Sequence, residues 1–126
     1  RGARFIGTNA DVTYPSERGP LPGAGSILAL LATATGQQPL VIGKPNAGMY
    51  EQAMARLALC PAETLMVGDR YDTDIAGAIS LGIQTAGILT GVTSRIEFEQ
   101  AIIPPQLIVN DLPDLVEIFR QSDNHK

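Results

Sequence analysis

The chain has 126 residues, 44% of them hydrophobic, and a formal net charge of -4 at pH 7. This composition supplies a core for one ordinary domain or parts of two, and it excludes a disordered chain. The acidic balance argues against nucleic acid as a partner, since a nucleic-acid groove needs a basic stripe to neutralise phosphates.

Three features of the chain bear on its setting. It begins at Arg1 with no initiator Met, so we expect it to be a piece of a longer polypeptide. Its single cysteine, Cys60, cannot form an internal disulfide, which fits a cytoplasmic, reducing compartment. The longest apolar stretch, residues 27–34, is too short to cross a bilayer, and no leader resembles a signal peptide, so we expect no membrane partner.

The first predicted elements are short. Residues 5–8 predict a strand, and residues 14–25 a Pro- and Gly-rich connection. Apolar side chains at helical spacing over residues 27–34 predict a helix that Gly36 ends. Residues 40–42 predict a second strand. The helix expected after it has one face made of Met49, Tyr50, Ala53, Met54 and Leu57.

The middle of the chain predicts a strand, a helix and a further strand. Residues 64–67 form the expected central strand, and residues 83–89 the next. The helix between them ends at Gly82. Its predicted buried face consists of Ile75, Ala78 and Ile79.

The last elements carry clear capping signals. Ser94 and Glu97 have the spacing of a capping box for a short helix. Residues 107–109 predict a last strand, and Asp111 caps the helix that follows. The side chains expected to point inward from that helix are Leu112, Leu115, Val116 and Phe119.

Strands and helices therefore alternate along the chain. This alternation predicts an α/β fold, in which a parallel sheet carries right-handed crossover helices on its faces. The Pro- and Gly-rich stretch at residues 14–25 and the turn at residues 36–39 are the predicted boundary candidates, and they leave a small N-terminal piece, residues 1–39, and a core piece, residues 40–126.

Three carboxylates follow the central strand. Asp69 comes directly after it, and Asp72 and Asp74 lie at the start of the next helix, where ligands bind in open α/β sheets. One alternative is that Asp72 or Thr73 only caps the helix while the other acids are solvated. Three negative charges so close together repel one another unless a cation compensates them, which favours a metal site over simple capping. Mg²⁺ suits one or two carboxylates plus phosphate, with Asp69 as direct ligand and Asp74 holding a metal-bound water.

A lysine follows the strand at residues 40–42. If the strands are parallel, Lys44 in Gly43-Lys44-Pro45 lies on the same sheet edge as Asp69. An ammonium there neutralises phosphate charge or keeps an aspartate ionised. The alternative, an exposed loop lysine, is the better interpretation of Lys44 taken by itself.

These segments together resemble a known family. Gly43-Lys44-Pro45, residues 68–74 and Leu89-Thr90-Gly91-Val92, in this order, resemble the C-terminal half of a haloacid-dehalogenase (HAD) superfamily phosphatase. The nearest branch is the NagD-like group, subfamily IIA, which includes 4-nitrophenyl-, phosphoglycolate- and pyridoxal-phosphate phosphatases. Residues 5–11 and 22–26 are also similar to segments of that group, so the resemblance covers nearly the whole chain.

The resemblance implies a fold and a chemistry. The fold is a HAD-like Rossmannoid sheet, with residues 1–39 as the last part of a C2-type cap domain. The chemistry is hydrolysis of a small phosphorylated metabolite by a Mg²⁺-assisted aspartate, through an aspartyl-phosphate. The matching positions make Asp69 the metal ligand and Asp74 its supporting acid. They also make Lys44 the lysine at the phosphoryl group and place Asn9 and Asp11 on the substrate-selecting cap loop. A homodimer is left open.

One part of the family pattern is missing from the sequence. The nucleophile motif, of Asp-x-Asp-Gly-Thr type after the first core strand, and the Ser/Thr phosphate-binding motif are both absent. We therefore expect an incomplete sheet that lacks its first core strand and has an exposed edge, and no catalysis by the chain alone.

Two alternatives to a phosphatase portion remain open. The first is a non-catalytic module of the same fold that binds phosphate or metal, or that oligomerises. The second is a phosphoacceptor receiver domain, which the order of Lys44 before Asp69 does not suit. The sequence does not indicate which phosphate ester would be the substrate.

Overall fold

The protein is described by a computed structural model in which residues 2–123 are placed, while Arg1 and residues 124–126 lie outside the described part. The described elements are of mixed α/β type with parallel strand pairing, which confirms the predicted fold class. Contacts divide the chain into two compact units, Arg1–Met49 and Tyr50–Lys126. The predicted domain boundary after residue 39 stays a prediction.

The first unit is built on a pair of short parallel strands. Strand β1 (Ile6–Gly7) pairs with β4 (Leu40–Val41), and backbone bonds from Leu40 N–H to the Phe5 carbonyl and from Ile42 N–H to the Gly7 carbonyl continue the pairing. Strand β4 thus pairs with β1, while β5, β6 and β7 form a separate parallel sheet within the described residues, and the sheet edge expected to be shared by Lys44 and Asp69 stays a prediction. Gly7 of β1 packs tightly against Leu28 of helix α1 (Ala24–Thr35).

The connection over residues 14–25 contains more structure than its composition predicts. Strands β2 (Thr13–Tyr14) and β3 (Leu21–Pro22) form an antiparallel hairpin. Its loop is closed by two backbone bonds between Ser16 and Gly19, with Gly19 at a φ of 102°. Helix α1 (Ala24–Thr35) follows and ends at Gly36, as predicted, with this glycine in the left-handed conformation.

The second unit contains a parallel sheet in the order β5-β6-β7. The strands are β5 (Leu65–Gly68), β6 (Gln84–Ile88) and β7 (Leu107–Val109). Within residues 2–123, β5 therefore lies at an edge of this sheet and not at its centre. This is the exposed edge expected for a sheet whose first strand is missing.

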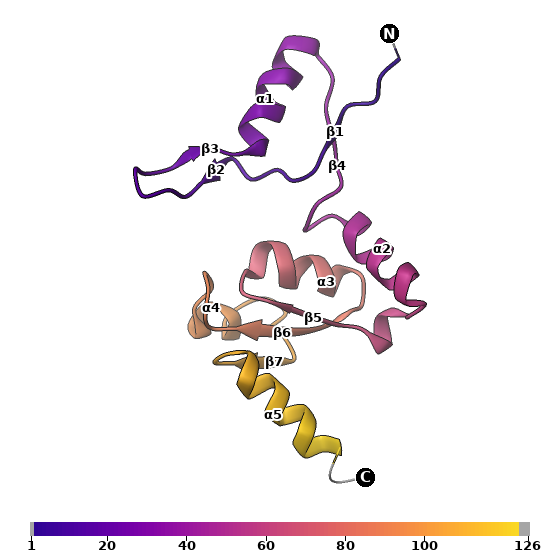
Figure 1. The fold of residues 1–126 in the computed structure, drawn as a ribbon, viewed down its shortest axis with the longest axis vertical. Coiled ribbons are helices and arrows are strands. Elements are labelled where there is room, and N and C mark those ends of the chain that lie inside the picture. Colours follow the sequence, from indigo (N-terminus) through magenta and orange to yellow (C-terminus); the bar gives the residue numbers. More distant parts are fainter. Residues whose placement is uncertain (1, 124–126) are drawn as a thin grey trace. The chain divides into compact units, whose positions relative to one another are not determined.

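Helices pack on both faces of this sheet. Leu65 and Val67 pack into a cluster with Leu115 of α5 (Leu112–Asp123), while Met66 packs with Tyr50 of α2 (Ala47–Leu57) on the other face. This alternation is the two-residue period of a strand buried on both sides. Figure 1 shows α3 (Ala76–Ser80) and α5 on opposite sides of the strands.

The helix caps predicted at Ser94 and Asp111 are confirmed, but the buried face predicted for the last helix is not. Ser94 and Glu97 form the capping box of α4 (Arg95–Glu99), and Asp111 accepts a bond from the Asp114 amide at the start of α5. Of the four α5 side chains expected to point inward, only Leu115 is buried. Strand β7 is three residues long, so it covers little of the apolar face of α5. The exposed ones are Leu112, Val116 and Phe119.

Helix α3 is preceded by an irregular turn. A short 3-10 helix, Pro61–Glu63, leads into β5, and a π-helical turn, Tyr71–Ile75, joins β5 to α3. The predicted buried residues Ile75 and Ala78 are both fully buried, and Gly82 ends the segment at a φ of 71°. In the described part of the chain, no helix has the length and apolar character needed to cross a membrane.

Candidate functional site

Asp69 is the first residue after β5, at the carboxyl end of the sheet. One of its carboxylate oxygens, Oδ2, accepts a hydrogen bond of 3.0 Å from the Val92 backbone N–H, and its carbonyl accepts one of 3.0 Å from the Thr93 N–H. Both donors belong to the loop after β6, the strand that pairs with β5. The Val92 bond takes one lone pair of Oδ2, which leaves acceptor capacity on both oxygens for a cation.

Gly91 permits this approach of the loop to Asp69. A Cβ at position 91 would collide with the carboxylate of Asp69. The glycine therefore has a steric reason to stand beside the acid, and any side chain here would push Asp69 or the loop aside. The sequence marked Leu89-Thr90-Gly91-Val92 only as part of a family pattern.

Asp74 is buried beneath the same junction, with 5% of its surface exposed. Its Oδ2 accepts a hydrogen bond of 3.3 Å from the Arg70 N–H, across the turn that joins strand to helix. Gly68 lies against it, so that a Cβ at position 68 would come within 2.6 Å of Oδ2. The structure thus brings Asp69 and Asp74 to one strand end, as the sequence predicted, with Asp74 the more enclosed.

The π-helical turn sets the spacing between these acids. The N–H groups of Asp74 and Ile75 both donate to the Arg70 carbonyl, at 3.0 and 3.3 Å. The second of these bonds spans five residues, which is the π pattern and is frequent at functional sites.

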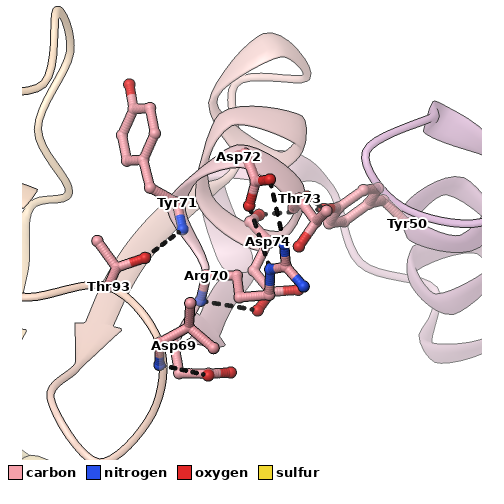
Figure 2. Close-up of polar contacts among 9 residues, drawn as sticks. Tyr50, Asp69, Arg70, Tyr71, Asp72, Thr73, Asp74 and Thr93 are labelled. Atoms are coloured by element: carbon pink, nitrogen blue, oxygen red, sulfur yellow. Dashed lines mark hydrogen bonds and ion pairs between the residues drawn. The ribbon is translucent and has the colours of Figure 1, made fainter. Parts of the chain in front are cut away.

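Tyr50 of α2 holds this turn from the opposite side. Its hydroxyl donates to the carbonyls of Thr73 and Asp74, at 2.8 and 3.0 Å (Figure 2). Burial, with a smaller contribution from the Asp74 charge, raises the pKa of Tyr50 to about 12. The sequence placed Tyr50 only on an apolar helix face, although a tyrosine at a core position needs a partner for its hydroxyl.

Replacing Tyr50 by Phe should destabilise this unit by about 1–2 kcal/mol, because the hydroxyl proton shared by the part-buried Thr73 carbonyl and the buried Asp74 carbonyl is lost. A tyrosine whose pKa is raised on folding stabilises the fold below its unfolded pKa of about 10. That contribution disappears as the pH rises through about 12. Urea unfolding should therefore show a gap between wild type and Tyr50→Phe that is full at pH 9 and closes between pH 10 and 12.

The exposed Tyr14→Phe variant is the control and should show no such gap. A gap for Tyr50→Phe that stays constant over this pH range would contradict the assignment.

Asp72 differs from its two neighbouring acids. Its two oxygens lie 3.3 and 3.4 Å from the Nε and Nη2 of Arg70, and both side chains are exposed. Arg70 therefore balances one of the three charges that the sequence analysis assigned to a cation. Asp72 becomes the natural control for the other two.

Asn9, Asp11 and Lys44 lie in the first unit. The Asn9 side chain accepts a bond of 3.1 Å from the Asp11 N–H, which shapes their loop, and Asp11 is exposed. The segments after the parallel strands β1 and β4 meet here, since Gly43 packs against the Thr8 carbonyl and a Cβ at position 43 would come 3.2 Å from the Asn9 Cα. Asn9 and half-buried Lys44 therefore belong to neighbouring segments.

The donor set at the end of β5 fits a hard cation in part. Within residues 2–123, no three His, Cys, Asp or Glu side chains gather closely enough to hold a metal ion among themselves. Mg²⁺ commonly takes one or two protein carboxylates and completes its shell with waters and substrate phosphate. The Asp69 carboxylate at the end of β5 could supply one such ligand.

Comparison with known proteins identifies relatives over most of the chain. A family model described as HAD-hydrolase-like matches residues 41–115. An acid sugar phosphatase of Staphylococcus saprophyticus is 43% identical over 92% of this chain, but the match covers 45% of that protein. The chain thus spans less than half the length of this curated relative.

Solved structures also match most of this chain but less than half of their own length. The p-nitrophenyl phosphatase of Archaeoglobus fulgidus superposes with a TM-score of 0.82 at 38% identity, covering 93% of this chain and 47% of that one. The glycerol phosphate phosphatase of Mycobacterium tuberculosis, solved in complex with magnesium, superposes with a TM-score of 0.77 at 45% identity. That match covers 90% of this chain and 35% of the other.

Proposed function

The chain belongs to the HAD-hydrolase-like family, and on this premise we propose that it is the C-terminal portion of a Mg²⁺-dependent phosphatase. Its substrates would be small phosphate monoesters, cleaved through an aspartyl-phosphate. The observation that carries the proposal is the pair of carboxylates, Asp69 and buried Asp74, held at the carboxyl end of β5. The relatives named above are called an acid sugar phosphatase, a p-nitrophenyl phosphatase and a glycerol phosphate phosphatase.

Each predicted site residue receives a role in this proposal. Asp69 would supply the metal-ligating oxygen, Asp74 would hold Asp69 and a water in place, and Lys44 would neutralise charge on the phosphoryl group. Asn9 and Asp11 would contact the substrate from the cap loop. The magnesium ion, when bound, would offset the charge that builds on the phosphoryl oxygens.

The remaining parts of the proposal concern domains and setting. Residues 1–39 would be the end of a cap domain and residues 40–126 the second half of the core. The proposal includes a cytoplasmic location, where the exposed thiol of Cys60 would stay reduced. Neither nucleic acid nor membrane is proposed as a partner, and pairing of two copies would be a property of the longer protein.

The proposal predicts that this chain alone does not hydrolyse p-nitrophenyl phosphate, because its sequence contains no nucleophile motif. The same chain, joined to the sequence encoded upstream of Arg1 in the same reading frame, should show Mg²⁺-dependent turnover. Release of p-nitrophenol is the measurement. Absence of turnover by the joined protein with phosphate esters of several kinds would favour the non-catalytic module instead.

A further inference from the structure

The loop after β6 forms hydrogen bonds to the backbone on both sides of Arg70. The Thr93 N–H donates to the Asp69 carbonyl at 3.0 Å. The Thr93 Oγ1 accepts from the Tyr71 N–H at 3.0 Å, as Figure 2 shows. One residue thereby fixes the peptide segment from Asp69 to Tyr71 with two hydrogen bonds. That segment is the exit of β5 and the entry to the π-helical turn.

The same loop also reaches the Asp69 side chain. The Val92 N–H donates to Oδ2, and Gly91 leaves the room for this contact that a Cβ would fill. Asp69 is therefore held at its carbonyl and at its carboxylate by consecutive residues. Val92 holds Asp69 through its backbone N–H, and Gly91 makes room because it has no side chain. Thr93 is the residue of the three that also uses its side-chain hydroxyl.

We propose that Thr93 is a positioning residue that directs the Asp69 carboxylate toward the cation, an inference that rests on the function proposed above. Thr93 does not itself touch the cation, and its oxygen is engaged by the Tyr71 amide. Without the hydroxyl, this half-buried amide loses its acceptor, and the segment from Asp69 to Tyr71 is held less firmly by its remaining bonds. The Asp69 oxygens then sample several directions, and the affinity for a divalent cation falls.

The test uses the polypeptide joined to its upstream part, with Mn²⁺ as a spectroscopic substitute for Mg²⁺. Electron paramagnetic resonance of free Mn²⁺ gives the dissociation constant without any turnover. The variants are Thr93→Val, which removes the hydroxyl at nearly constant shape, and Thr93→Ser, which keeps it. Thr64→Val is the matched control, because its hydroxyl bonds to the Cys60 carbonyl just before β5, at the opposite end of the strand.

Thr93→Val should weaken Mn²⁺ binding by about tenfold, as expected when a residue behind a metal ligand is removed. Thr93→Ser and Thr64→Val should bind as wild type does. Circular dichroism at the titration temperature shows which variants are folded. If Thr93→Val is unfolded, Thr93→Ala takes its place, and the same loss of Mn²⁺ affinity is expected.

Two results would overturn the inference by itself. In both, Asp69→Asn abolishes Mn²⁺ binding. In the first, the folded variant without the hydroxyl binds Mn²⁺ with unchanged affinity. In the second, Thr93→Ser loses as much affinity as Thr93→Val. If Asp69→Asn leaves Mn²⁺ binding intact, the proposed metal site itself is wrong, so the two failures are distinguishable.

Discussion

Replacing Asp69 by Asn in the joined polypeptide should lower Mg²⁺-dependent turnover of p-nitrophenyl phosphate by about 10²- to 10³-fold. An asparagine has almost the same shape, and its carbonyl oxygen can still accept from the Val92 N–H, so the loop after β6 should stay in place. What the variant loses is the negative charge and one anionic ligand oxygen. The loss should therefore lie in turnover and in metal affinity, and the thermal unfolding midpoint should change little.

Asp72→Asn is the matched control for this prediction. Asp72 lies three residues further on in the same turn, but it is exposed and pairs with Arg70. An exposed ion pair of this kind contributes little to stability, and no proposed step uses it. Equal losses in Asp69→Asn and Asp72→Asn would show that the general acidity of the turn matters and not the ligand position of Asp69.

Replacing Gly68 by Ala should damage both the fold and the site. The new Cβ would collide with the Cβ of Asp74, and its Cγ would be 2.7 Å away. Asp74 is buried and cannot swing into solvent, so either the π-helical turn or the end of β5 must shift. Overpacking of this kind costs about 1–3 kcal/mol. Chemical unfolding should show that loss, and the joined polypeptide should also lose activity because Asp74 is displaced.

Gly48→Ala in α2 provides the control for a glycine-to-alanine change. A Cβ there would meet Ile42 at 3.3 to 3.9 Å, close to ordinary contact, and alanine favours a helix. Its effect on stability should be small. A Gly68→Ala variant as stable and active as Gly48→Ala would mean that the end of β5 has more room than the structure shows.

Local signals in the sequence were sufficient for most elements of the fold. The capping box at Ser94 and Glu97, the Asp111 cap and the glycine stops at Gly36 and Gly82 all depend on residues within a few positions of one another. These features were confirmed because short-range hydrogen bonds and backbone conformation determine them.

Features that depend on distant partners could not be predicted. Strand β4 pairs with β1, which lies more than thirty residues earlier, and each strand is only two residues long, so neither has a strong pattern. The burial of α5 depends on how much of β7 lies beneath it, which the apolar periodicity of the helix does not reveal.

The candidate site shows the same division between local and distant signals. The acids Asp69 and Asp74 follow a strand in an evident pattern, and their roles stay predictions. Tyr50 and Thr93 bond to this turn from positions more than twenty residues away, so no spacing rule identifies them. The Arg70–Asp72 pair could have been considered, because the two charges are two residues apart in the sequence.

A crystal structure of the joined polypeptide with Mg²⁺ and a phosphate analogue would test the metal site most directly. We predict an Asp69 carboxylate oxygen about 2.0–2.1 Å from the cation, with Asp74 behind it and Asp72 outside the coordination shell. A cation bound without Asp69, or an Asp69 carboxylate turned away with no room for an ion beside it, would contradict the proposed function.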